Sequence, residues 1–126
     1  MSNGLTLDAG GLIAFERNDR TVVGIVARAW RHNARLAVPA GVVGQVWRDG
    51  RHQVRLARLL GSGLVDVVPL DDASARAAGQ LCGVAGTRDV IDASVVLCAR
   101  KHGHAVLTSD AGDLSRLDSS LRYVRV

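Results

Sequence analysis

Three aspartates, Asp8, Asp92 and Asp110, occupy positions from which carboxylates could act together. Asp8 directly follows the alternating segment 4–7 and Asp110 follows the segment 105–109, so each comes at the end of a predicted strand. In an open parallel sheet the ligand crevice lies beyond the carboxyl ends of the strands, which favours a functional role for both residues. The alternative is that each aspartate only caps the helix that follows it.

Asp92 is harder to explain as a helix cap. It lies inside the apolar segment Val90–Ala99, which is predicted to be a helix buried on most of its faces. A buried, ionised carboxylate costs several kcal/mol unless it is paired or coordinates a metal. Asp89 lies one helical turn earlier, where the helix dipole favours negative charge. Capping therefore accounts well for Asp89 and less well for Asp92.

A cluster of these three carboxylates would need a cation. At a separation of about 4 Å and an effective dielectric constant of about 20, each pair repels by a few kcal/mol. An all-oxygen ligand set suits Mg²⁺ or Mn²⁺, whereas zinc would favour His or Cys. The chemistry that such a centre performs best is phosphodiester hydrolysis, in which the metal activates water and stabilises charge on the phosphate oxygens.

The elements that must position these residues follow from the hydrophobic periodicity. Short strand-like segments alternate with amphipathic helical segments, which predicts an α/β fold with a parallel sheet covered on both faces. We expect strands at 4–8, 36–38, 64–68, 105–108 and 123–126. We expect further helices at 21–32, 40–47, 53–60, 73–83 and 90–101. Because no linker or internal repeat divides the chain, residues 1–126 are predicted to form a single domain.

The composition supports a globular protein without disulfide bonds. Of the 126 residues 48% are hydrophobic, which at this length is enough to form a core. Cys82 and Cys98 have no CxxC motif and no His at metal-ligand spacing, so we expect buried thiols. No apolar run reaches the roughly 18 residues of a membrane span, and residues 1–8 do not resemble a signal peptide. These features predict a cytoplasmic protein with no membrane contact.

Positive charge is concentrated in the first half of the chain. The net charge is +4; residues 1–63 carry nine Arg and four acidic residues, whereas residues 64–126 carry seven basic and eight acidic residues. This asymmetry suits a protein that attracts a polyanion and holds a cation elsewhere. Arg48, Arg51, Arg55 and Arg58 have the spacing of a stripe along one helical face. The stripe is either an ordinary solvated face or a surface that follows RNA phosphates.

Three ordered motifs carry a family resemblance: Leu7–Ile13, Arg88–Ser94 and Leu107–Asp110. In this order, spacing and chain length they resemble the PIN domain and, within it, the bacterial VapC toxins of VapBC toxin–antitoxin pairs. The resemblance spans essentially the whole chain. It implies a three-layer α/β/α fold with a central parallel sheet of about five short strands.

The resemblance also implies roles for individual residues. The three catalytic metal ligands would be Asp8, Asp92 and Asp110, and Thr108 would provide the hydroxyl that often accompanies them. Asp89 and Asp113 match accessory acidic positions and would be further candidates for metal ligands. The implied activity is that of a ribonuclease dependent on Mg²⁺ or Mn²⁺.

The partners follow from the same resemblance. It implies a homodimer, inhibition by a small VapB-type antitoxin that covers the acidic groove, and a structured RNA target such as tRNA or rRNA. A receiver-type phosphoacceptor domain is a rival of similar length with an acidic Mg²⁺ pocket. Such domains have paired acids after the first strand and a Lys after the fifth, whereas here Ala9 follows Asp8 and the sole Lys is Lys101, in a predicted helix.

One position departs from the family pattern. PIN nucleases usually carry Glu in the helix after the second strand, and the segment 38–47 offers Gln45. An amide keeps a carbonyl oxygen for a metal or its water but brings no charge, so it should weaken cation binding and cannot act as a base. Glu16, the only Glu of the chain, lies late in the first helix and is a poor substitute. The alternative interpretation is therefore a catalytically weak PIN domain that binds RNA or a partner protein.

Overall fold

Five parallel strands form one sheet in the order β3-β2-β1-β4-β5. The structure is a computed structural model and describes residues 4–126. The central strand β1 pairs Leu5 with Leu36 of β2 on one side and with Ala105 of β4 on the other. The strands are β1 (Leu5–Leu7), β2 (Leu36–Pro39), β3 (Val65–Val68), β4 (Ala105–Thr108) and β5 (Tyr123–Arg125).

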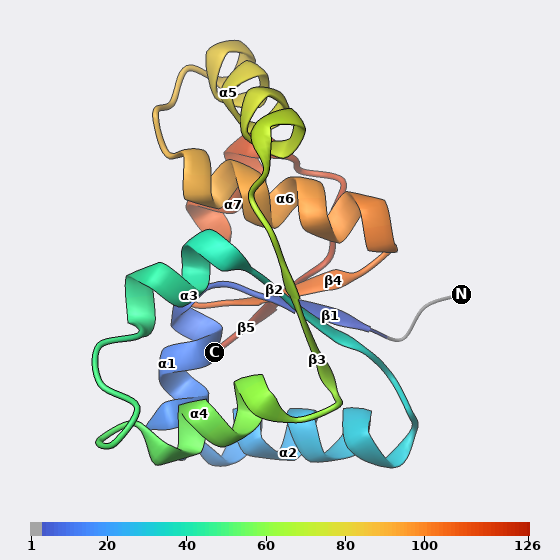
Figure 1. Cartoon of the computed structure of the whole chain (residues 1–126). Helices are drawn as coiled ribbons and strands as arrows, with labels where there is room; N and C mark the ends of the chain where they lie inside the picture. The colour runs from blue at the N-terminus through green and yellow to red at the C-terminus, as the bar shows by residue number, and fades with distance from the viewer. Residues whose placement is uncertain (1–3) are drawn as a thin grey trace.

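Helices cover both faces of this sheet. In Figure 1, α5, α6 and α7 lie above the sheet, and α1, α2 and α4 lie below it. Because of this cover, β2 and β4 are buried along their whole length. The helices are α1 (Ala9–Glu16), α2 (Arg20–Arg31), α3 (Ala40–Val46), α4 (Val54–Gly61), α5 (Asp72–Ala85), α6 (Val90–His102) and α7 (Ala111–Leu117).

Local sequence signals set where several helices begin and end. The carboxylates of Asp19, Asp71 and Asp89 each accept a backbone N–H from the first turn of the following helix, at 2.8–3.1 Å. Gly86 and Gly103 end α5 and α6 with φ angles of +75° and +66°, a conformation that glycine adopts without steric cost. The short turn after Gly86 therefore places the start of α6 at a defined point.

Helix α6 is the central helix of the upper layer. It packs against β1, β2 and β4, and its Val95 and Val96 are fully buried together with Leu7 and Leu107 of the strands. Its apolar middle is thus accounted for by packing on the sheet. The first turn of the same helix extends past the carboxyl ends of the strands, which is where Asp92 lies.

The three-layer α/β/α class predicted from the sequence is confirmed. Predicted element bounds differ from the observed ones by one or two residues; for example, the helix expected at 73–83 spans Asp72–Ala85. Cys82 and Cys98 are buried free thiols, as expected. Among residues 4–126, no helix is long and apolar enough to cross a membrane. The prediction about residues 1–8 falls in part on residues 1–3, which lie outside the described part of the chain.

The predicted arginine stripe along one helical face is wrong. Helix α3 ends at Val46 and α4 begins at Val54, so Arg48 and Arg51 lie in the connecting loop. The side-chain oxygen of Gln53 accepts the backbone N–H groups of Arg48 (2.7 Å) and Asp49 (2.9 Å). These bonds satisfy backbone donors that a continuous helix would have used, and so they hold the loop in a non-helical form.

Candidate metal centre

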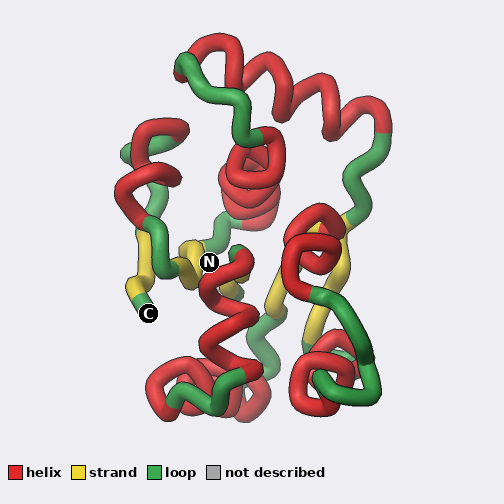
Figure 2. The backbone as a smooth tube through the Cα atoms, turned by 90° about the vertical axis from the view of Figure 1, so that its left-hand side faces the viewer, coloured by secondary structure: helices red, strands yellow, loops and turns green. Residues whose placement is uncertain are grey.

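The candidate site lies at the carboxyl ends of β1 and β4. These two strands are neighbours, but the chain leaves β1 toward β2 on one side and leaves β4 toward β5 on the other. Such a reversal opens a crevice beyond the strand ends, because the two connections diverge. Figure 2 shows this side of the molecule, with α6 seen nearly end-on between α7 and α3 and with α1 below it.

Asp8 is the buried member of the site. Its side chain is 6% exposed and caps α1, with one oxygen accepting the Gly11 N–H at 3.0 Å. The other oxygen accepts a hydrogen bond from the Thr108 hydroxyl. Burial raises the pKa of Asp8, and the hydrogen bonds from Thr108 and Gly11 act in the opposite direction. The carboxylate is therefore held in one orientation by protein donors.

Thr108 joins the two strand ends of the site. It is fully buried at the last position of β4, and its hydroxyl oxygen also accepts the backbone N–H of Asp110 at 2.8 Å. One hydroxyl thus donates to Asp8 and accepts from Asp110. This arrangement fixes the start of α7 relative to the start of α1.

Two glycines let α1 approach β4 closely enough for this bond. A Cβ atom on Gly10 would lie 2.0 Å from the Ser109 hydroxyl oxygen, and one on Gly11 would lie 2.8 Å from the Leu107 carbonyl oxygen. The sequence gives no phosphate-binding motif at Gly10 and Gly11. Their role in the structure is to bring the helix start against the backbone of the neighbouring strand.

Three further carboxylates converge beside Asp8. The carboxylate oxygens of Asp92, Asp110 and Asp113 lie within 4.8 Å of one another. Burial, followed by the charges of Asp89, Asp110 and Asp8, raises the pKa of Asp92 to about 7. Burial and the neighbouring Asp113 also raise the pKa of Asp110. The carboxylates therefore repel one another, as expected from the sequence.

This donor set fits a hard divalent cation. The converging ligands are carboxylate oxygens only, which suits Mg²⁺ or Mn²⁺ in the way that a His or Cys cluster would suit zinc. A cation would relieve the repulsion that, together with burial, raises the pKa of Asp92 and of Asp110. Of the predicted ligands, Asp92 and Asp110 lie together with Asp113, and Asp8 is close enough for its charge to act on Asp92.

Asp89 caps α6 and also borders the site. Its carboxylate accepts the Asp92 N–H at 2.9 Å, which is the capping role expected from its position. It also lines a hollow of about 180 Å³ together with Asp92 and Asp113. Its charge acts on Asp92 and Asp110, so Asp89 contributes negative potential to the site in addition to capping the helix.

Gln45 lies in a different hollow. It is exposed near the end of α3 and lines a hollow of about 300 Å³ with Glu16, Arg17 and Arg48. No hydrogen bond among the described residues joins Gln45 to the carboxylate cluster. The Glu16 carboxylate accepts hydrogen bonds from the Gln53 amide at 3.2 and 3.3 Å, so its structural partner is the loop after α3.

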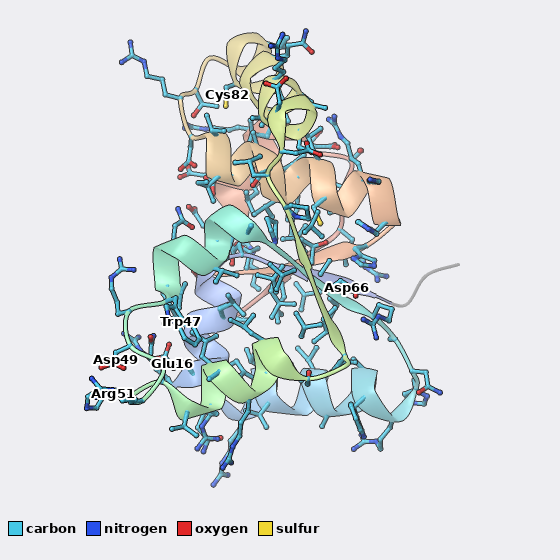
Figure 3. All side chains as sticks on the ribbon, in the orientation of Figure 1. Glu16, Trp47, Asp49, Arg51, Asp66 and Cys82 are labelled. Atoms are coloured by element: carbon cyan, nitrogen blue, oxygen red, sulfur yellow. The ribbon has the colours of Figure 1, made fainter. Side chains whose placement is uncertain are left out.

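The three arginines expected to contact RNA have separate environments. Arg48 donates to the carbonyl oxygens of Gly44 and Trp47, and Arg55 on α4 donates to the Asn18 side chain. Arg51 pairs with Asp49 at 3.4 Å in the loop after α3; both residues are labelled in Figure 3. All three are exposed; Arg48 and Arg51 lie in the loop between α3 and α4, and Arg55 lies in α4.

Comparison with known proteins gives a family and several similar folds. A family model described as the PIN domain matches residues 6–119. No curated protein matches the sequence. A chain of VapBC2 from Rickettsia felis, solved bound to a promoter DNA fragment, superposes with a TM-score of 0.70 at 12% identity and covers 98% of both chains.

Two other solved structures have the same fold. VapC20 from Mycobacterium tuberculosis, described as a toxin that cleaves the sarcin–ricin loop, has a TM-score of 0.65 at 21% identity, over 97% of this chain and 99% of its own. A chain of FitAcB from Neisseria gonorrhoeae has a TM-score of 0.61 at 18% identity, over 96% of each chain. At these identities the superpositions describe a shared architecture across nearly the full length.

Proposed function

Because this chain belongs to the PIN domain family, we propose that it is a metal-dependent endoribonuclease that acts as the toxin of a type II toxin–antitoxin pair. The observation that carries the proposal is the convergence of Asp92, Asp110 and Asp113 beside the buried Asp8, at the carboxyl ends of β1 and β4. Clustered carboxylates of this kind serve phosphodiester hydrolysis when they hold a divalent cation.

The residues that would hold the cation are Asp8, Asp92 and Asp110, with Asp113 and Asp89 as further carboxylates at the same site. A bound Mg²⁺ or Mn²⁺ would supply a water of lowered pKa and positive charge against the phosphate oxygens. Asp8 keeps its orientation through Thr108 and Gly11, and the start of α1 favours its negative charge. Asp92 must lose the proton that its raised pKa retains before it can act as a ligand.

The proposed substrate is a structured RNA such as tRNA or rRNA. VapC20, which shares the fold, is described as cleaving a ribosomal RNA loop. Arg48, Arg51 and Arg55 are exposed and lie in the basic half of the chain, which supports their role in attracting the RNA backbone. Such contacts to phosphates give affinity but carry little sequence information.

The proposed protein partners are a VapB-type antitoxin and a second copy of the chain, with the system located in the cytoplasm. Two of the similar structures, VapBC2 and FitAB, were solved with DNA, the first of them with a fragment from its promoter. The names of these structures describe complexes of paired proteins, which supports an antitoxin partner for this chain.

A second candidate is a PIN domain of low catalytic activity that binds RNA or a partner. The sequence resemblance aligns Gln45 with the Glu that PIN nucleases usually carry, which would leave the centre with one carboxylate fewer. Fewer negative charges near the centre would weaken the binding of a divalent cation.

One assay separates the two candidates. Purified protein is incubated with total RNA in Mn²⁺, in Mg²⁺ and in a chelator, alongside the Asp8→Asn variant. If the protein is a nuclease, the wild type should cleave RNA only when metal is present, and Asp8→Asn should not cleave it. Binding of RNA without cleavage in either metal, at protein concentrations that saturate the RNA, would favour the second candidate.

A further inference from the structure

A single arginine lines the acidic hollow at the metal centre. Arg116, near the end of α7, borders the hollow of about 180 Å³ that Asp89, Asp92 and Asp113 also line. It lies one helical turn after Asp113, so both residues project from the same side of α7. A hollow of this volume has room for a phosphate group beside a metal ion.

The guanidinium of Arg116 has no partner within residues 4–126. It is exposed, and none of the hydrogen bonds or ion pairs of these residues includes it. Asp118, two positions later, is engaged by Arg100 at 2.6 Å. In the same way Arg35 and Arg76 each pair with an aspartate. Arg116 therefore keeps all its donors while it borders a site rich in negative charge.

Arg116 shares the hollow with Asp89, Asp92 and Asp113 but is not paired with any of them. Among residues 4–126, no hydrogen bond or ion pair joins its guanidinium to these carboxylates. Arg116 thus borders the hollow with its donors still available to a ligand.

We propose that Arg116 binds a phosphate of the RNA strand in this hollow, next to the metal-binding carboxylates, and so positions the strand for cleavage. The inference rests on the proposed ribonuclease function. A guanidinium offers paired, planar N–H donors that match two oxygens of one phosphate. The RNA backbone is repelled by the carboxylates, and a cationic side chain on the rim offsets that repulsion where the strand enters.

As a positioning residue, Arg116 acts on the substrate and not on the metal. Removing its charge should weaken RNA binding, whereas the affinity for Mn²⁺ without RNA should stay the same or increase, because a positive charge near the cation site is removed. Replacement of a residue that only supports the fold of the carboxylate cluster would weaken both RNA binding and Mn²⁺ binding. The two roles therefore predict different changes in metal binding.

The test compares Arg116→Gln and Arg116→Lys with the control Arg31→Gln. Arg31 is also exposed and without a partner among residues 4–126, but it ends α2 on the opposite face of the sheet (Figure 1). Steady-state cleavage of a defined tRNA gives KM and kcat, and a melting titration with Mn²⁺ alone gives the metal affinity. We expect Arg116→Gln to raise KM about tenfold or more and Arg116→Lys to raise it less, because lysine keeps the positive charge. Arg31→Gln should leave both KM and the Mn²⁺ affinity unchanged.

RNA binding is measured separately in the Asp92→Asn background, with and without Arg116→Gln, as a function of salt. Removal of one phosphate interaction should lower the log–log salt slope by about 0.7–0.9. The role of Arg116 would be overturned if Arg116→Gln left both KM and the salt slope of RNA binding unchanged. It would also be overturned if the variant lost Mn²⁺ affinity as strongly as it lost RNA affinity. Absence of cleavage by the wild type would instead remove the proposed nuclease function, while the binding comparison would still decide on Arg116.

Discussion

At the scale of single residues, the carboxylates of the site divide into two kinds. Both oxygens of Asp8 accept hydrogen bonds from protein donors, whereas Asp92, Asp110 and Asp113 face one another. Sequence spacing predicted that Asp8, Asp92 and Asp110 converge, because each follows a recognisable strand or opens an apolar helix. The structure brings Asp92 and Asp110 together and places Asp8 where its charge acts on Asp92. It could not show how closely Asp113 approaches them, since that depends on where α7 is directed by Thr108.

Asp92→Asn is expected to abolish cleavage while leaving the metal-free protein as stable or more stable. The pKa of Asp92 is raised to about 7, so between pH 4 and 7 the folded state binds more protons than the unfolded state. The stability of the metal-free wild type should therefore fall as the pH rises through this window, and Asn removes that decrease. RNA cleavage and thermal melting at several pH values measure both effects. Full activity in the variant would remove Asp92 from the site.

Gln45→Glu tests whether this residue acts on the metal centre. If Gln45 occupies the position of the family's Glu, the new charge should destabilise the metal-free protein through repulsion. With Mn²⁺ the sign should reverse, because metal bound only to the folded state stabilises it by RT ln(1 + [L]/Kd) and the added charge lowers Kd. Melting titrations of both proteins against Mn²⁺ provide the measurement. Parallel curves would place Gln45 outside the reach of the metal.

At the scale of elements, the sequence predicted regular segments better than the connections between them. Helical periodicity located α2, α5 and α6 to within two residues because an apolar face repeats along each of them. The gap between the helices expected at 40–47 and 53–60 is observed, but the arginine spacing was misread as a stripe on one helical face. The side chain of Gln53 holds Arg48 and Asp49 in a turn between the two helices. The close packing of α1 on β4 could not be predicted either, because two glycines are compatible with many local structures.

Gly11→Ala should destabilise the protein by about 1–3 kcal/mol, because the added methyl group would lie 2.8 Å from the rigid Leu107 carbonyl oxygen. Displacement of α1 should also separate Asp8 from Thr108 and reduce cleavage. Gly24→Ala is the matched control: it lies inside α2 with nothing within 4 Å of the new methyl group, and should stabilise by about 0.5–1 kcal/mol. Chemical denaturation of both variants gives the comparison. If Gly11→Ala and Gly24→Ala changed the free energy of unfolding equally, α1 could shift away from Leu107 without cost.

At the scale of the whole molecule, the fold class was predictable because alternating strands and helices in one chain of this length allow few arrangements. The order of the strands was not specified by the sequence pattern. It determines which strand ends are neighbours, and it places β1 beside β4, so that Asp8 and Asp110 follow neighbouring strand ends. The charge asymmetry between the two halves of the chain is likewise a property of the molecule as a whole.

The combined replacement of Arg48, Arg51 and Arg55 by Gln should weaken RNA binding and make it less dependent on salt. For each phosphate interaction that is removed, the log–log slope should fall by about 0.7–0.9. Because Arg48 and Arg55 also bond to the protein, melting curves must accompany the binding curves. If the salt slope of the triple variant equalled that of the wild type, these arginines would not contact RNA phosphates and would only be solvated surface residues.

The hydrogen bond from Thr108 to Asp8 joins residues that are 100 positions apart in the chain. No amino-terminal fragment that ends before β4 can contain it, and in such a fragment one edge of the central strand β1 also lacks its neighbour. During translation the carboxylate cluster therefore cannot assemble until Asp110 and Asp113 have left the ribosome. Bringing such distant segments together also costs loop-closure entropy, which slows the formation of their contacts. A partly synthesised chain that ends before β4 therefore lacks the hydrogen bond from Thr108 to Asp8 and the carboxylates of Asp110 and Asp113.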